Sequence, residues 1–174
     1  MPEKIKINVF SRKSISDAIS RVQKKQDDIE GGFTKTVEQL TQIGFEYMLT
    51  IVKMESGALA DSITWEYDRE TKTGRIKVGA AYAIFVEYGT GVRGAASPHP
   101  EKIPGWTYDV NVHGEAGWWY PTTASDPNPT KKQASDGSWI AHTKGQPASA
   151  FVYRTYQYMK KHAGEVLRVN MGNG

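Results

Sequence analysis

The four histidines are the first residues to consider for metal or acid–base chemistry. No two of them lie three to five residues apart, and the sequence has no HExxH pattern, so the usual helical spacings of zinc ligands are missing. Cysteine is absent, which excludes disulfides, thiolate metal sites and cysteine nucleophiles. We therefore expect hydrogen-bonded or solvated histidines, with no metal site. The histidines are His99, His113, His142 and His162.

A glycine-rich run over 89–94 matches the GxGxxG pattern of dinucleotide-binding loops. Such a loop requires a helix that begins there, because the helix N-terminus holds the pyrophosphate. Pro98, Pro100 and Pro104 follow closely, and we expect them to exclude that helix. We interpret the run as a tight turn after a strand, and no GxSxG elbow supports a serine hydrolase either.

Glu87 and a group of aromatic residues are further candidates. A buried Glu87 could serve as a general acid or base, but no partner carboxylate is near it in the sequence, so a hydrogen-bond or ion-pair anchor is favoured. Trp118 and Trp119 could stack on sugars or nucleobases. Neighbouring strand residues point to opposite faces, so one tryptophan would pack inward. Core or interface packing is favoured, and a carbohydrate- or nucleic-acid-binding module is an alternative.

Hydrophobic periodicity predicts the helices that would position these residues. Apolar residues at helical spacing predict one kinked helix or two helices over 14–54, with Ser14 in a loose capping box and Gly31-Gly32 weakening the middle. We interpret the apolar stripe of this region as core packing or a subunit seam. A second helix is predicted over 148–168, with Pro147 in its first turn.

Alternating apolar and polar residues predict the strands. A short strand or a frayed terminus is expected over 5–9, and an antiparallel meander over 62–88, with its third strand at 83–87. That third strand would be apolar on both faces. We expect one face to be covered by a helix and the other by a neighbouring subunit.

Residues 92–146 differ in composition from the rest of the chain, because they contain most of the prolines and four of the five tryptophans. We expect an extended excursion, with a hairpin from 117–120 to 138–141 and a flexible tip over 126–137.

The length of 174 residues suits a single domain, 1–174. The net charge of +3 is too small to indicate nucleic-acid binding, and no apolar run approaches the roughly 20 residues that cross a bilayer.

Three segments together resemble a known protein family. Residues 55–63 resemble a TGxLxxSI turn, residues 82–91 a YAxxVExGTG signature, and residues 145–151 a GxPAxPF lead-in to a C-terminal helix. These are marks of the small head–tail joining proteins of long-tailed phages, also called tail-completion or minor tail proteins. Ser56 stands where threonine is usual, Ala150 replaces the expected proline, and the excursion is long for the family.

The resemblance implies an α+β fold, with a long N-terminal helix or helix pair and a C-terminal helix packed on an antiparallel β-sheet. It implies a structural protein of the virion neck that forms a ring, commonly of about six copies, with no enzymatic activity and no cofactor. Its partners would be the connector or stopper and the tail-tube or tail-terminator proteins.

DNA would pass through such a ring without specific recognition, and assembly would take place in the host cytoplasm. A tail-terminator ring is the near alternative. The residues that we expect to form the interface or the structural motifs are Gly57, Leu59, Ile63, Tyr82, Phe85, Glu87, Tyr88, Gly89, Thr90, Gly91, Trp118, Trp119, Trp139, Pro147 and Phe151.

Overall fold

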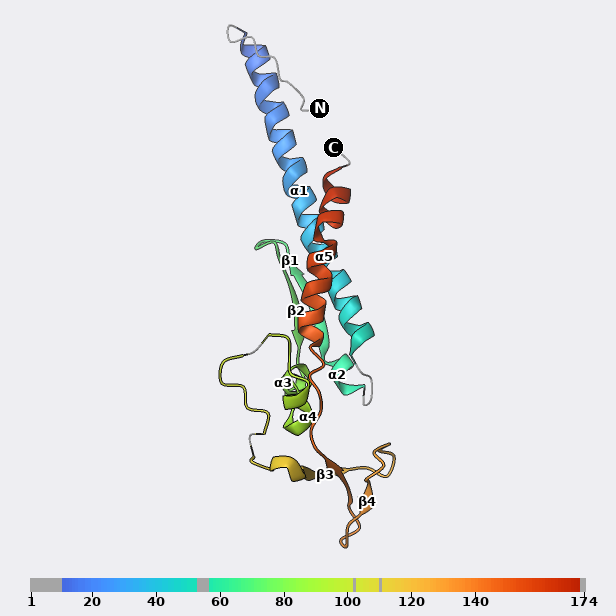
Figure 1. The fold of residues 1–174 in the computed structure, drawn as a ribbon. Helices are drawn as coiled ribbons and strands as arrows, with labels where there is room; N and C mark the ends of the chain where they lie inside the picture. Colours follow the sequence, from blue (N-terminus) through green and yellow to red (C-terminus); the bar gives the residue numbers. More distant parts are fainter. Residues whose placement is uncertain (1–10, 53–56, 102, 110, 173–174) are drawn as a thin grey trace. The chain divides into compact units, whose positions relative to one another are not determined.

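The chain divides into two compact units, whose helices and strands are labelled in Figure 1. The structure is a computed structural model that describes residues 11–52, 57–101, 103–109 and 111–172. Unit 1 takes its described residues from 11–50, 64–77 and 155–172, and unit 2 from 51–63 and 78–154. The α+β fold is confirmed, whereas the single domain stays a prediction. The predicted strand over 5–9 and the last residues of the predicted 14–54 helix lie outside the described residues.

Unit 1 is built on one long helix, α1 (Arg12–Ile51). The helix begins before Ser14, and the Ser11 side-chain oxygen accepts a hydrogen bond from the Ser14 N–H at 3.3 Å. Gly32 does not break the helix. A Cβ at Gly32 would lie 2.5 Å from the Met171 sulfur, so this glycine allows the end of the C-terminal helix to come close.

The C-terminal half of α1 packs against the other elements of unit 1. These are a two-stranded sheet of β1 (Ile63–Asp68) and β2 (Thr73–Val78), without its outermost residues Ile63 and Val78, and the part of α5 (Phe151–Met171) from Thr155 onward. The rings of Tyr47 and Tyr158 stack with centroids 4.0 Å apart, and Phe45 packs on Trp65. These aromatic contacts join α1 to α5 and to strand β1.

Unit 2 contains short helices and a three-stranded sheet. The helices are α2 (Ala58–Asp61), α3 (Ala83–Tyr88), α4 (Gly91–Ala96) and the 3-10 turn η1 (Gly114–Ala116). The sheet has the order β3-β5-β4, with β3 (Trp118–Thr122), β4 (Lys132–Gln133) and β5 (Trp139–Thr143).

The hairpin predicted within the excursion is confirmed, because β3 and β5 pair antiparallel. Its register places Trp118 opposite Thr143 and Thr122 opposite Trp139. The predicted tip over 126–137 needs a correction. Lys132 pairs with Ile140, so part of that tip is a third strand of the sheet.

The predicted third strand over 83–87 is wrong, because these residues form α3. A short apolar run has no periodicity that separates a strand from a buried helix. In the helix, Ala83 and Glu87 lie one turn apart and are both buried, whereas Tyr82, Ile84 and Phe85 are exposed. The argument that a neighbouring subunit covers the second face of a strand therefore loses its basis.

Two predicted helix boundaries also need correction. A six-residue helix, α4, does begin at Gly91, because the prolines start at Pro98, beyond its last residue. Pro147 is not in the first turn of the C-terminal helix, which begins at Phe151. Ala150, directly before it, has a φ of 50°, which no helical residue adopts.

Candidate functional site

The side chain of Glu87 links α3 to the start of α5, all within unit 2. One carboxylate oxygen, Oε2, accepts a hydrogen bond from the Val152 N–H at 2.8 Å, and Oε1 accepts one from the Tyr153 N–H at 3.1 Å. The first turn of a helix leaves such N–H groups without helical partners, and its partial positive charge stabilises a carboxylate. Glu87 therefore caps a helix that begins more than 60 residues later in the chain.

His99 is a further hydrogen-bond partner of this carboxylate. Its Nε2 lies 2.9 Å from Glu87 Oε1, and the two residues are only 4% and 5% exposed. The other ring nitrogen, Nδ1, lies 2.6 Å from the Glu101 carbonyl oxygen and 3.0 Å from the Glu101 nitrogen. Both ring nitrogens of His99 are thus engaged within the protein, which suits a structural clamp better than a proton shuttle.

Backbone hydrogen bonds join the same two segments. The Ser149 and Ala150 N–H groups donate to the carbonyls of Val86 and Glu87 at 2.9 and 3.0 Å. Residues Thr90 and Gln146 form an antiparallel bridge, with bonds of 2.9 and 3.1 Å. The signature at 82–91 and the lead-in at 145–151 therefore form one hydrogen-bonded unit, which we name the Glu87 junction.

Glycines allow the two backbones of the Glu87 junction to approach. Gly89 ends α3 with φ 78° and ψ 166°, a conformation that is essentially restricted to glycine. A Cβ at Gly89 would lie 2.7 Å from the Ala148 nitrogen. A Cβ at Gly145 would lie 1.9 Å from the Thr90 carbonyl oxygen, so a larger residue there would separate the strands of the bridge.

An aromatic cluster lies beside the Glu87 junction. The ring of Tyr88 lies 4.4 Å from His99 and 5.2 Å from Trp106, measured between centroids. Burial raises the pKa of the Tyr88 hydroxyl, with smaller contributions from Glu87 and Glu101. A cleft of about 250 Å³ opens next to these rings and is lined by Tyr88, His99, Glu101, Ile103, Trp106 and Tyr108.

The three-stranded sheet carries the remaining tryptophans. Trp118 is half-buried and stacks on His113, with centroids 4.7 Å apart. Trp119 is exposed on the opposite face, and the Lys132 ammonium lies over its ring at 4.1 Å. One face of the exposed ring therefore already has a cationic partner in the same chain.

Asp126 organises the connection between β3 and β4. Its carboxylate accepts hydrogen bonds from the Thr122 hydroxyl and from the Asn128 N–H, the latter at 2.7 Å. These bonds, led by that of Thr122, lower the pKa of Asp126 below its ordinary value. Asn128 in turn donates to the His142 carbonyl on β5 at 3.1 Å. The segment expected to be a flexible tip thus has specific tertiary partners.

The residues singled out in the sequence fall into separate places in unit 2. The Glu87 junction brings together those of α3, of the glycine run and of the segment before α5. Leu59 and Ile63 are buried near α2, whereas the sheet carries the three tryptophans at a different place. Those in the junction are Phe85, Glu87, Tyr88, Gly89, Thr90, Gly91, Pro147 and Phe151.

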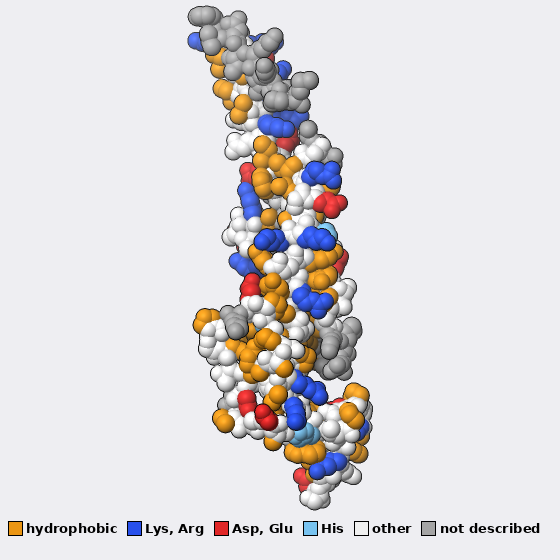
Figure 2. Space-filling model, in the orientation of Figure 1, with side chains coloured by type: hydrophobic (Ala, Val, Ile, Leu, Met, Phe, Trp, Pro, Cys, Tyr) orange, Lys and Arg blue, Asp and Glu red, His pale blue; other side chains and the backbone are white. Residues whose placement is uncertain are grey.

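Sequence reasoning missed two features. His99 was not linked to Glu87, because the two are twelve residues apart and only the folded α4 segment brings them together. The second is where along α1 the stripe is packed. Apolar side chains lie at the surface of its N-terminal half, between lysines and arginines (Figure 2), so core packing is wrong for this half and the alternative of a subunit seam stays a prediction. The exposure of residues 21–30 shows that this half is not core in the isolated chain.

Searches of family models, curated proteins and solved structures returned no match to this chain. In the described ranges, which omit 1–10, 53–56, 102, 110 and 173–174, no three His, Asp or Glu side chains gather as a metal ion would require. Within the same ranges, no helix has both the length and the apolar character needed to span a membrane.

Proposed function

We propose that this protein is a structural subunit of a tailed-phage neck, which joins the tail to the head as a head–tail connector or tail-completion protein. It acts by self-assembly into a ring, through head-to-tail contacts that close on themselves. It carries out no catalysis and requires no cofactor. The proposal starts from the three segments that resemble the head–tail joining family.

The observation that carries the proposal is the Glu87 junction. Two of the three family-like segments, which are more than 50 residues apart, share a backbone bridge and a buried carboxylate. Accidental matches to short patterns have no reason to converge in the fold. The convergence supports reading the segments as parts of one scaffold, with the excursion inserted between them.

The chemistry of the junction also favours a scaffold role. Glu87 and His99, the residues best suited to acid–base work, are buried and fully engaged with each other and with the backbone. A buried pair of this kind holds elements together and leaves no free group for a substrate. The apolar residues at the surface of α1 and α3 supply contact area for other subunits.

A null mutation in the phage that encodes the protein tests the proposal. We expect DNA-filled heads and separate tails, visible by electron microscopy, and restoration of infectious particles when the wild-type protein is supplied in trans. The protein should also be present in purified virions by mass spectrometry. Joined particles without the protein, or its absence from virions, would refute the proposal.

The tail-terminator alternative differs in the partner that the ring binds. A terminator binds the last tail-tube ring directly, so immobilised protein would retain purified tube protein in a pull-down. A head–tail connector would instead retain tails that already carry a terminator. The two results separate the alternatives within the same structural class.

A carbohydrate- or nucleic-acid-binding module is the alternative from another class. Its strongest support is Trp119, which is exposed and lies beside Lys132. Titration with oligosaccharides and single-stranded DNA would then quench tryptophan fluorescence in a saturable way, and Trp119→Ala would abolish that quenching. The cation–π contact of Lys132 with the same ring makes this the weaker candidate.

A further inference from the structure

The N-terminal half of α1 carries a regular stripe of exposed apolar residues. Ile15, Ile19, Val22, Ile29 and Phe33 are each 39–56% exposed. Their spacing alternates between four and three residues once Gln26 is included, which is the heptad repeat of a coiled-coil seam. From its first to its last residue the stripe runs about 27 Å along the helix. A single strand of a coiled coil cannot bury such a seam by itself.

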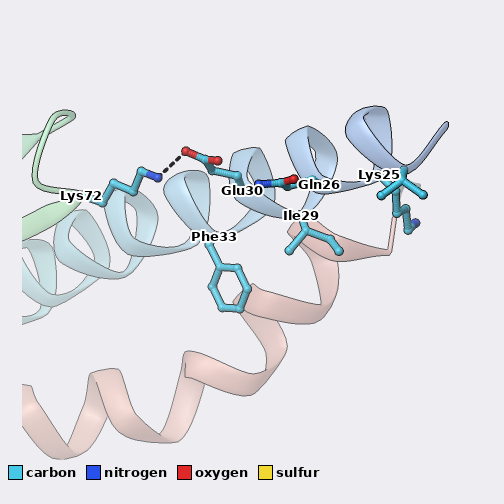
Figure 3. A pocket seen from close by; sticks show the side chains of 7 residues that line it. Lys25, Gln26, Ile29, Glu30, Phe33 and Lys72 are labelled. Atoms are coloured by element: carbon cyan, nitrogen blue, oxygen red, sulfur yellow. Dashed lines mark hydrogen bonds and ion pairs between the residues drawn. The ribbon is translucent and has the colours of Figure 1, made fainter. Parts of the chain in front are cut away.

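The C-terminal part of the stripe is a groove with defined edges (Figure 3). Ile29 and Phe33 point from one side of α1, and Glu30, at the edge of the groove, points away from them toward Lys72 in the turn between β1 and β2. The ion pair with Lys72 lowers the pKa of Glu30. The groove holds about 590 Å³, and its lining is almost entirely apolar between these charged edges.

The charges beside the seam distinguish between the possible orientations of a second helix. In heptad terms, Ile15, Val22 and Ile29 occupy d positions, and Lys25 and Glu30 occupy the flanking g and e positions. In a parallel pair in register, g of one helix faces the next e of the other. Lys25 of each copy then faces Glu30 of its neighbour, which keeps its ion pair with Lys72 of its own chain.

An antiparallel pair is disfavoured by the same charges. Full overlap of the stripe would set Ile19 against Ile29 of the other helix and would bring the two Lys25 side chains beside each other. Like charges at such positions repel. Gln26, the polar residue within the seam, would meet its own copy only in the parallel register, where two amides can hydrogen-bond to each other.

We infer that residues 15–33 of α1 are a self-association surface, on which a second copy of this chain packs its own α1 in parallel and in register. Any rotation axis that runs along the helices generates this arrangement, whatever the copy number. The inference rests on the proposed function only in so far as ring subunits must contact one another, and it assigns that contact to α1.

Cysteine cross-linking on the purified, full-length protein tests the orientation. The chain has no cysteine, so Ile19→Cys introduces a single thiol in the seam. We expect oxidation to give a disulfide-linked dimer on a non-reducing gel, whereas Lys24→Cys, on the opposite side of the helix, gives no cross-linked band. Cross-linking only in a mixture of Ile19→Cys with Ile29→Cys would indicate an antiparallel pair and would overturn the inference.

Charge reversal tests the proposed ion pair between copies. Lys25→Glu alone and Glu30→Lys alone should each weaken self-association on the order of tenfold, because like charges would then face each other. An equimolar mixture of the two variants should restore it, as followed by sedimentation velocity. No restoration in the mixture would remove the basis for the parallel register.

The occupant of the stripe is tested by thiol labelling. If the wild-type protein stays monomeric at its highest soluble concentration, the inference fails. A monomer in which Ile19→Cys reacts slowly with a maleimide would mean that the stripe is covered within the same chain, and would also overturn the inference. These experiments use purified protein and the null mutation uses virions, so the inference and the proposed function can fail separately.

Discussion

The N-terminal half of α1 and the Glu87 junction place their side chains in opposite environments. Along α1, apolar residues lie at the surface at regular spacing, and the charges beside them are solvated. In the junction, a carboxylate and an imidazole are buried, and each polar atom has a partner. The first region leaves apolar surface uncovered in the isolated chain, whereas the polar groups of the second are paired within the chain. Stability and assembly are therefore expected to depend on different residues.

The largest effect is expected from the junction. Glu87→Ala leaves His99 and the first N–H groups of α5 buried without their acceptor, which should lower the free energy of unfolding by about 3–5 kcal/mol. Glu87→Gln keeps one acceptor oxygen and should cost less. Urea denaturation followed by tryptophan fluorescence measures both, with Glu115→Ala as an exposed control. A loss below about 1 kcal/mol would contradict the role of the carboxylate as a clamp.

The next effect compares the two halves of α1. Met48 is 3% exposed, so Met48→Ala should cost about 2–5 kcal/mol through lost burial and a cavity. Val22 is more than half exposed, so Val22→Ala should change the stability of the dilute monomer by less than about 0.5 kcal/mol. Thermal unfolding followed by circular dichroism measures both. Equal losses would mean that the stripe is already buried in the monomer.

Backbone strain in the junction is expected to come third. Gly89→Ala places a Cβ in a glycine-only conformation and 2.7 Å from the Ala148 nitrogen, and should cost about 1–3 kcal/mol or more. Gly105 also has a positive φ, of 82°, but nothing lies within 4 Å of the position that a Cβ would take there, so Gly105→Ala measures the cost of a positive φ without a clash. Gly164→Ala, in the open middle of α5, should instead stabilise by about 0.5–1 kcal/mol. A Gly89→Ala loss no larger than that of Gly105→Ala would show that close approach is unimportant.

The smallest effect is expected on the stability of the fold at low pH. The Thr122 hydroxyl and the Asn128 N–H lower the pKa of Asp126, so the unfolded chain binds its proton more readily than the folded chain. The stabilisation is present above the unfolded value of about 3.9 and is lost as pH falls through the folded pKa. Carboxyl-carbon NMR should show the Asp126 pKa rise toward the ordinary value in Thr122→Val, and not in Thr123→Val. An unchanged titration in Thr122→Val would contradict the assigned cause.

Local patterns in the sequence were sufficient for the long elements and insufficient for the short ones. The two long helices were predictable because many residues repeat the same helical period. The run over 83–88 was not, since six residues fit both a strand and a helix. The junction was predictable only in part. Glu87 and the glycine run were candidates because of their residue types, but nothing in the sequence near His99 indicated that it pairs with Glu87.

The sequence by itself determined that this chain is an α+β protein without cysteine, with an apolar seam on its first helix and a tryptophan-rich excursion. Only the tertiary structure decided that Glu87 caps α5, that Gly32 is a contact and not a break, and that the seam faces outward. The reason is physical. Periodicity and composition are properties of neighbours along the chain, whereas a buried charge is stable only beside groups that folding brings to it from elsewhere.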